Sequence, residues 1–146
     1  MFVSQKRILV EYGHCGPAGI VYCPQFMRWF DACTTTLFSS AGLTLPRIFE
    51  EQGVLGIPIV NLETRFLLPS TCGDELLAQS KVSRWGRSSF VVHHLFSKGE
   101  LPVAEGFETR VWAAFDTAHP DQIQSRPLPP EVVDRLSVPR TVVAAP

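Results

Sequence analysis

The sequence predicts an α+β fold in which an antiparallel sheet of five strands wraps around one long central helix. Two patterns support this prediction. Apolar side chains recur with a helical period between residues 26 and 41, whereas most of the chain from residue 55 to 115 has the composition and turn signals of strands. A helix with so apolar a face must be buried, and the available strands bury it only as one sheet that curls around it.

The first predicted strand covers residues 6–12, KRILVEY, most of which are β-branched, aliphatic or aromatic. A loop with three glycines follows. From Pro24 the period changes to that of a helix of about five turns, which ends at Gly42. The apolar face of this helix consists of Phe26, Trp29, Phe30, Cys33, Leu37 and Ala41.

A second, shorter helix is predicted at residues 45–53, because Pro46 stands near its start and Gly53 at its end. Four further strands follow, separated by turn residues. They cover residues 55–68, 75–85, 88–98 and 102–115.

The end of the chain differs in composition. From residue 117 it is rich in proline and polar residues, and only PPEVVDRL, at 129–136, is expected to form a brief helix. We therefore expect one domain, residues 1–136, followed by a mobile C-terminal tail, residues 137–146.

The composition restricts the kinds of function. The formal net charge is -1, and the lysines and arginines are not clustered as in proteins that bind nucleic acid. No apolar run is long enough to span a membrane, and the start of the chain lacks the apolar stretch of a signal peptide, so a cytoplasmic location is expected. Hydrophobic residues make up 45% of the chain, a high share that points to apolar surface buried between subunits.

The four cysteines, Cys15, Cys23, Cys33 and Cys72, form no C-x-x-C pair. Their spacing is not that of a zinc site, and a metal held by His14, Cys15 and Cys23 would have no fourth ligand in the loop. We expect reduced thiols and no bound metal.

The start of the long helix lacks a capping residue. Cys23 precedes Pro24, where serine, threonine, aspartate or asparagine would normally accept a hydrogen bond from the first free amides. Together with the positive end of the helix dipole, these amides could bind an oxygen that carries negative charge in a ligand or transition state. The alternative is that water caps them.

Three segments together resemble a known family. They are PAGIVYCPQFMRWFDA at residues 17–32, GVLGIPIV at 53–60 and RWGRSSFVVHH at 84–94. On these motifs the chain resembles the hotdog-fold thioesterases, and within them the 4-hydroxybenzoyl-CoA thioesterase family, over residues 6–136. The resemblance implies hydrolysis of aromatic or short to medium acyl-CoA thioesters, with no cofactor because CoA belongs to the substrate. It also implies a homodimer, or a homotetramer, with the active site between subunits.

In the mechanism that the resemblance implies, an amide at the start of the long helix binds the thioester carbonyl oxygen. An aspartate in the preceding loop acts as nucleophile or general base. By position, the oxyanion donor is the backbone N–H of Cys23. The family's loop resembles D-x-D-P-A-G, whereas this chain has His14, Cys15 and Gly16 before Pro17, so both acids are missing and Gly16 replaces the catalytic one.

His14 is the first candidate to do the work of that aspartate, since an imidazole can accept a proton from water near neutral pH. The alternative is that His14 only caps the loop by hydrogen bonding. Cys15 is a weaker candidate, as a nucleophile. Glu63 stands on a predicted strand that passes near the pocket in this fold, so it is either an acid or base or a solvated charge paired with Arg65.

For the CoA phosphates the resemblance points to Arg84, Arg87 and Ser89, around a turn that is more basic in the family. Only Arg87 stands at a matching basic position. His93 and His94 have no partner visible in the sequence, and we expect them to be structural.

Two other functions compete with hydrolysis. A hydratase or dehydratase of enoyl or hydroxyacyl thioesters would use His14 from the loop and Asp31 from the helix. A protein that binds acyl-CoA without converting it is the third hypothesis, because the loop acid is missing.

Overall fold

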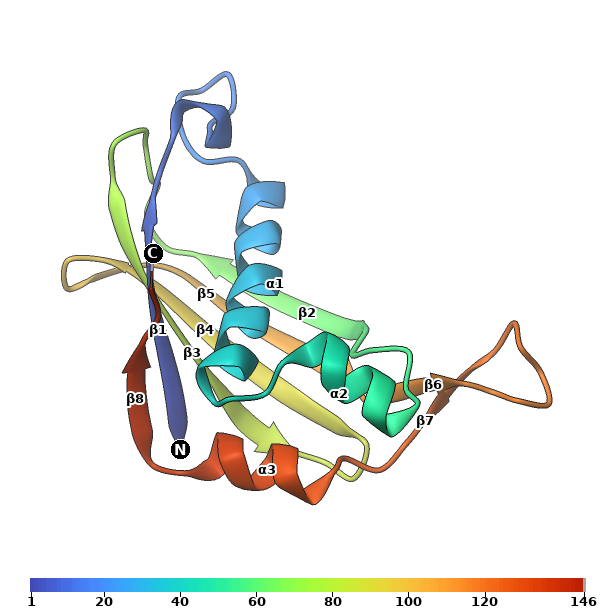
Figure 1. The fold of residues 1–146 in the computed structure, drawn as a ribbon. Coiled ribbons are helices and arrows are strands. Elements are labelled where there is room, and N and C mark those ends of the chain that lie inside the picture. The colour runs from blue at the N-terminus through green and yellow to red at the C-terminus, as the bar shows by residue number, and fades with distance from the viewer. Residues whose placement is uncertain (146) are drawn as a thin grey trace.

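The sheet has six strands, one more than the sequence predicts, and it curves around the longest helix (Figure 1). The computed structural model describes residues 1–145. Across the sheet the order is β2, β5, β4, β3, β1, β8, and all neighbours are antiparallel except β1 and β8. The strands are β1 (Phe2–Leu9), β2 (Ile59–Phe66), β3 (Glu75–Trp85), β4 (Ser89–Lys98), β5 (Leu101–Val111) and β8 (Arg140–Val143).

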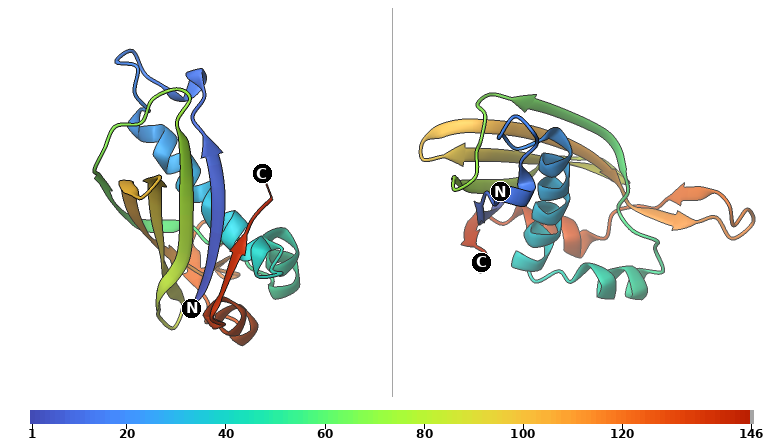
Figure 2. Two further views of the ribbon diagram at one scale, coloured as in Figure 1. Left: turned by 90° about the vertical axis from the view of Figure 1, so that its left-hand side faces the viewer. Right: turned by 90° about the horizontal axis from the view of Figure 1, so that it is seen from above.

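The helix α1 (Cys23–Ser40) lies where the apolar period predicts it and packs on the concave face of the sheet (Figure 2). Near its centre, the ring of Phe30 stacks on His94 of β4, with ring centroids 5.1 Å apart. The same ring covers Gly106 of β5, where an added Cβ would lie 2.7 Å from the ring. The close approach of α1 to the sheet therefore depends on a glycine at this position.

Two shorter helices also lie where the sequence predicts them. The helix α2 (Leu45–Gln52) ends at Gly53, whose φ of 61° is in the left-handed region that favours glycine. The helix α3 (Pro130–Ser137) buries Val132 and Leu136 in a core cluster. No helix within the described part of the chain is both long and apolar enough to cross a membrane.

The C-terminal tail differs from the expectation of a mobile segment. Residues 140–143 form β8, in which Arg140 lies opposite Phe2 and Val143 opposite Gln5 of β1. The reason is that β1 begins at Phe2, earlier than predicted, and leaves residues 2–5 with an open edge. The β-branched run of the tail, TVV, covers that edge.

A hairpin between β5 and α3 is also missing from the sequence analysis. Its strands are β6 (Ala113–Phe115) and β7 (Ile123–Ser125), and Phe115 lies directly opposite Ile123. We call residues 113–125 the arm, because the hairpin projects away from the rest of the molecule (Figures 1 and 2). The polar, proline-containing composition of residues 116–122 hides it in the sequence, since these residues form its turn rather than a disordered segment.

Candidate active site

The loop between β1 and α1 is held in shape by its own backbone. It begins with the short 3₁₀ helix η1 (Tyr12–His14). The amide of Gly16 donates a hydrogen bond to the carbonyl of Ile20, and the amide of Gly19 donates one to the carbonyl of Gly16, each at 2.9 Å. Gly19 has a φ of 78°, which few other residues adopt. The glycines therefore allow the tight reversal that leads the chain into α1.

The first helical residue, Cys23, has a free backbone N–H. The residue before it, Tyr22, makes no capping hydrogen bond with its side chain. Pro24 has no N–H, and the amide of Gln25 already donates to the carbonyl of Tyr22 at 3.0 Å. Within residues 1–145, the Cys23 N–H thus has no hydrogen-bond partner. It stands at the positive end of the helix dipole and can bind an oxygen that carries negative charge.

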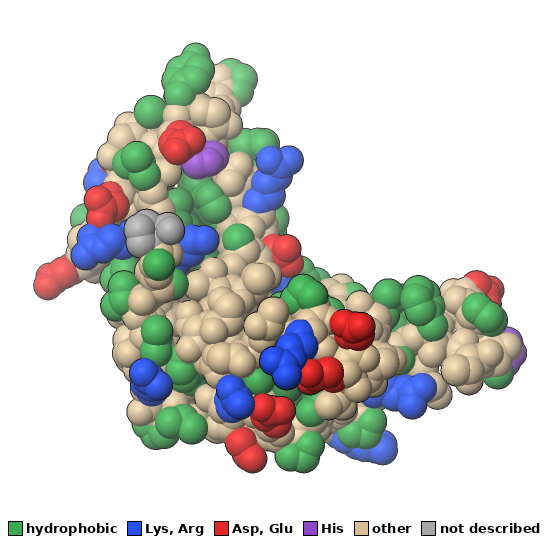
Figure 3. Space-filling model, in the orientation of Figure 1, with side chains coloured by type: hydrophobic (Ala, Val, Ile, Leu, Met, Phe, Trp, Pro, Cys, Tyr) green, Lys and Arg blue, Asp and Glu red, His purple; other side chains and the backbone are tan. Residues whose placement is uncertain are grey.

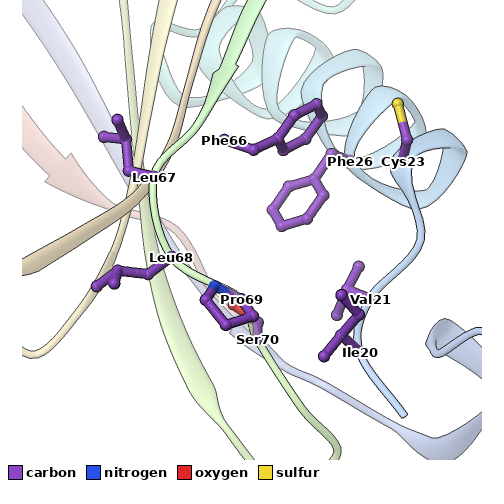
Figure 4. A pocket seen from close by; sticks show the side chains of 9 residues that line it. All are labelled: Ile20, Val21, Cys23, Phe26, Phe66, Leu67, Leu68, Pro69 and Ser70. Carbon is purple, nitrogen blue, oxygen red and sulfur yellow. The ribbon is translucent and has the colours of Figure 1, made fainter. Parts of the chain in front are cut away.

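A cavity of about 300 Å³ opens beside this amide (Figure 4). Phe26 of α1 and Phe66 of β2 supply aromatic rings to its wall, with ring centroids 5.4 Å apart. The hydroxyl of Ser70 is buried and has no hydrogen-bond partner within the described residues. The cavity is lined by Ile20, Val21, Cys23, Phe26, Phe66, Leu67, Leu68, Pro69 and Ser70. It therefore offers a mostly apolar space of the size of a small aromatic group, next to a free amide.

His14 is fixed by two contacts. Its Nδ1 accepts a hydrogen bond from the backbone N–H of Glu11 at 3.0 Å. Its ring meets the edge of Trp29 of α1, with centroids 5.1 Å apart. In the neutral form the proton must then lie on Nε2, because Nδ1 acts as acceptor. The structure thus shows the loop-capping contact that the sequence analysis named as the alternative to catalysis.

Gly16 lies in the wall of a second hollow, together with Tyr12, Cys15 and Cys72. A Cβ added at Gly16 would meet the Cβ of Tyr22 at 3.6 Å and the carbonyl oxygen of Ile20 at 3.9 Å, which are ordinary contacts. The site therefore has room for a side chain that the sequence does not supply. The thiol of Cys15 lies 3.7 Å from the carbonyl oxygen of Glu11.

The comparison with known protein families matches residues 10–136 to the thioesterase-like superfamily. The chain belongs to this superfamily. The match covers the loop, the free amide and the last four of the five strands that the sequence predicts, and it confirms the resemblance read from the sequence. Thioester hydrolysis is the reaction class that comes with it.

Named relatives agree with this assignment. The 4-hydroxybenzoyl-CoA thioesterase of Pseudomonas sp. (strain CBS-3) is 36% identical over 118 residues, which are 77% of this chain and 82% of that protein. The 1,4-dihydroxy-2-naphthoyl-CoA hydrolase of Synechococcus elongatus is 26% identical over 134 residues, 92% of this chain and 95% of that protein. A crystal structure of a mutant 4-hydroxybenzoyl CoA thioesterase complexed with 4-hydroxybenzoyl CoA superimposes with a TM-score of 0.84 at 28% identity, over 92% of this chain and 99% of that chain.

Glu63 points away from the face of the sheet that α1 covers. Its neighbour in the strand, Leu62, packs against the core under α1, so Glu63 points to the opposite face of the sheet. There it accepts a hydrogen bond from the side chain of Asn61 at 3.2 Å and shares a shallow hollow with Arg84. Arg65 pairs with Glu105 instead, at 3.2 Å. The structure therefore brings Glu63 together neither with Cys23 nor, in an ion pair, with Arg65.

The residues expected to bind phosphate lie around one tight turn between β3 and β4. The amide of Gly86 donates to the carbonyl of Ser89 at 2.7 Å, and Arg84 and Arg87 are exposed on either side. This turn is at the end of the sheet where Phe90 pairs with Arg110, whereas the Cys23 cavity is at the Phe66 end. Phe96 is level with Phe66 across the sheet and lies seven residue steps along β4 from Ser89, so the two parts are about 23 Å apart in one chain.

A buried cluster of charged groups beneath α1 escaped the sequence analysis. Glu108 of β5 accepts hydrogen bonds from Thr34 at 2.7 Å and from Arg110 at 2.9 Å, and lies 3.2 Å from His94. Burial alone would raise the pKa of Glu108, but the bonds with His94 and Arg110 outweigh it and lower that pKa to about 2. Glu108 therefore remains a carboxylate inside the protein.

The same cluster contains the partners of two residues that the sequence analysis considered separately, Asp31 and His94. Arg110 extends past Glu108 to Asp31 of α1, at 2.8 Å, so Asp31 makes the structural hydrogen bond of an ion pair. His94 is fully buried and its Nδ1 lies 2.7 Å from the hydroxyl of Ser80. The signal in the sequence was the spacing of Glu108, Arg110 and Trp112 at every second residue, which places both charges on the face that carries a buried tryptophan.

Proposed function

We propose that this thioesterase hydrolyses acyl-CoA thioesters with aromatic acyl groups. The observation that carries the proposal is the free Cys23 amide beside a cavity with the rings of Phe26 and Phe66 in its wall. The relatives named above act on 4-hydroxybenzoyl-CoA and 1,4-dihydroxy-2-naphthoyl-CoA, both with aromatic acyl groups.

In the proposed reaction, the thioester carbonyl oxygen accepts a hydrogen bond from the Cys23 N–H. Water attacks the carbonyl carbon, and the oxygen gains negative charge, which the amide and the helix dipole stabilise. The C–S bond then breaks, the CoA thiolate leaves and takes up a proton, and the free acid remains. The thiol of Cys23 takes no part in these steps.

Activation of the water falls to His14, since Gly16 has no side chain. To act as base, His14 must carry its proton on Nδ1 and present the lone pair of Nε2 to water. It then gives up the hydrogen bond from Glu11, at a cost of about 1 kcal/mol. That free-energy cost is smaller than the lowering of the activation barrier by a positioned general base, which corresponds to a roughly hundredfold acceleration or more.

The phosphate-binding turn would be contributed by a second copy of the chain. The edge strand β2 is unpaired on one side and exposes Ile59, Val60 and Phe66. Two copies that pair through β2 about a two-fold axis must run antiparallel, so the Ile59 end of one lies beside the Phe66 end of the other. The dimer thus brings Arg84, Arg87 and Ser89 of one subunit toward the Cys23 amide of its partner. A homotetramer would be a pair of such dimers.

Release of free thiol from a panel of acyl-CoAs tests the function directly. We expect 4-hydroxybenzoyl-CoA and other aromatic thioesters to be cleaved with a higher kcat/KM than short aliphatic ones. Thermal stabilisation by CoA without turnover on any thioester would show an acyl-CoA binder instead. A change in enoyl absorbance without thiol release would show a hydratase.

The geometry does not favour the hydratase. His14 packs on Trp29, whereas Asp31, two residues further along α1, points about 200° away around the helix and bonds to Arg110. The two side chains that this reaction requires are therefore held on different sides of α1.

Mixed dimers test the placement of the site between subunits. The variants Cys23→Pro and Arg87→Ala are each expected to be impaired alone. In a heterodimer of the two, one site combines the intact Cys23 of one subunit with the intact Arg87 of the other. Mixing should therefore restore activity. Mixtures no more active than the sum of the separate variants would place both groups in one subunit.

A further inference from the structure

The arm carries an apolar pair that nothing within residues 1–145 covers. Phe115 and Ile123 lie opposite each other on its two strands, and their exposed fractions are 54% and 59%. An isolated two-stranded hairpin is marginally stable in water. The projection of the arm from the body therefore indicates that another surface holds it in place (Figures 1 and 2).

A second apolar surface surrounds the mouth of the Cys23 cavity. Ile20, Leu67 and Leu68 line the cavity and yet remain 41%, 49% and 42% exposed. Leu67 and Leu68 directly follow β2, at the end of the strand opposite the arm. In one chain these side chains face open solvent on the outer side of the cavity. Hydrophobic side chains can be seen on the upper part of the space-filling view, where the loop before α1 lies (Figure 3).

The two-fold arrangement proposed above aligns the two surfaces. The arm begins beside the start of β2, because Ala113 bridges Gly56 and Arg110 pairs with Ile59. In the dimer that end of β2 lies beside the partner's Phe66, and the partner chain continues past it as its residues 67 and 68. The arm and this segment then run in the same direction, about two strand spacings apart, or ~10 Å.

At the base of the arm one segment lies between them. It is the chain just before β2, where Gly56 bridges Ala113. The gap lies across the strands, and two facing layers of side chains fill ~10 Å between packed β-structures. Side chains of the size of phenylalanine and isoleucine can close the remaining space.

We propose that the arm of each subunit closes the acyl cavity of the other, with Phe115 and Ile123 packed on Leu67 and Leu68 of the partner subunit. This inference rests on the proposed dimer. It makes Phe115 and Ile123 specificity residues, since they form the outer wall of the cavity and so limit the acyl groups that fit. It also explains why an apolar pair occurs within an otherwise polar hairpin.

Cross-linking tests the contact independently of turnover. In a background of Cys15→Ser, Cys23→Ala and Cys72→Ser, the pair Phe115→Cys and Leu68→Cys should form a covalent dimer with a short bismaleimide. A disulfide is too short for backbones ~10 Å apart. The matched control pairs Leu68→Cys with Val143→Cys, which is at least as exposed as Phe115 but lies on β8 at the far edge of the sheet. The control should stay uncross-linked. A dimeric protein in which neither pair cross-links would overturn the proposal and leave the hydrolase function standing.

Kinetics test the consequence for specificity. The double variant Phe115→Ser, Ile123→Ser should raise KM for aromatic acyl-CoAs about tenfold, with kcat changed less than about twofold. For acetyl-CoA, whose acyl group is too small to reach the outer wall, KM should hardly change. Equal KM values for aromatic substrates in the variant and the parent would overturn the role of the arm. Absence of turnover in the parent protein would instead contradict the hydrolase function, while the cross-link would still report on the contact.

Discussion

The Nδ1 atom of His14 accepts a hydrogen bond from the backbone N–H of Glu11 at 3.0 Å, so the candidate base, two residues before Gly16, also closes the loop. Capping and catalysis can be separated by two substitutions. In His14→Asn the side-chain oxygen can still accept the amide, but it cannot act as a base. In His14→Ala both roles are lost.

If His14 is the base, both variants should lose about a hundredfold in kcat, while only His14→Ala loses stability, by about 1 kcal/mol. Single-turnover thiol release and urea unfolding measure the two effects. Full turnover in His14→Asn would show that His14 only caps the loop.

The oxyanion donor can be tested at Cys23 without changing the charge of the site. Cys23→Pro removes the N–H at a position where α1 tolerates proline, and should lower kcat about a hundredfold or more. Cys23→Ala keeps the amide and removes only the thiol, so it serves as the matched control and should retain kcat. Loss of activity in Cys23→Ala would instead make the thiol part of the reaction.

A substitution at position 16 tests the site by a gain in activity rather than a loss. Because a Cβ at Gly16 meets only ordinary contacts, Gly16→Asp should fold and place a carboxylate in the loop. We expect it to raise the kcat of a His14→Ala protein about tenfold or more, since it supplies the missing base. Gly16→Asn has the same size without the charge and should give no such rise. Identical rates in the two variants would mean that position 16 does not reach the attacking water.

The stability of the protein should fall as the pH drops below about 6.5. Burial lowers the pKa of His94 from its usual 6.5, so the unfolded chain takes up a proton there that the folded chain does not. The free energy of unfolding then decreases with falling pH, by up to ~1.4 kcal/mol per pH unit. Glu108 adds a further loss between its usual 4.5 and about 2, as its carboxylate is protonated.

Urea unfolding at pH 7.5, 6.5 and 5.5 measures this dependence. His94→Gln should flatten it over this range, whereas His119→Gln, on the exposed turn of the arm, should leave it unchanged. The same slope in the His94→Gln protein and its parent would assign the loss to other groups.

The contact between Phe30 and Gly106 predicts a large effect from one methyl group. Gly106→Ala would place its Cβ 2.7 Å from the ring, so α1 must shift or the ring must leave its stack on His94. We expect a loss of about 1–3 kcal/mol in the free energy of unfolding. Gly13→Ala is the matched control, because an added Cβ there meets nothing within 4 Å. Gly99 also has open space around it, but its φ of 59° would strain an alanine.

Local patterns made most of the fold predictable. The period from Phe26 to Leu37 identified α1, and Pro24 after Cys23 identified its uncapped start, because both depend on neighbours in sequence. The elements that were missed depend on distant partners. The segment around Thr141 becomes a strand only because β1 offers an open edge. Ile123 pairs with Phe115 across a turn whose composition is typical of disordered segments.

The site was predictable only in part, for a similar reason. The amide of Cys23 follows from local sequence, whereas the face on which Glu63 lies depends on the register of β2 against β5. The partners of His94 could not be seen either, since Glu108, Ser80 and Thr34 come from three separate elements.

The two edges of the sheet are unequal, and this limits how far copies of the chain can add to one another. β2 presents eight residues of open backbone, whereas the opposite edge is β8, a strand of four that begins at Arg140. A head-to-tail contact between unlike edges could repeat without end and build a filament. A short strand is a poor template for such a contact, so only two β2 edges have enough length to join. By covering one edge with so short a strand, β8 would make two the natural stopping point for growth through strand pairing.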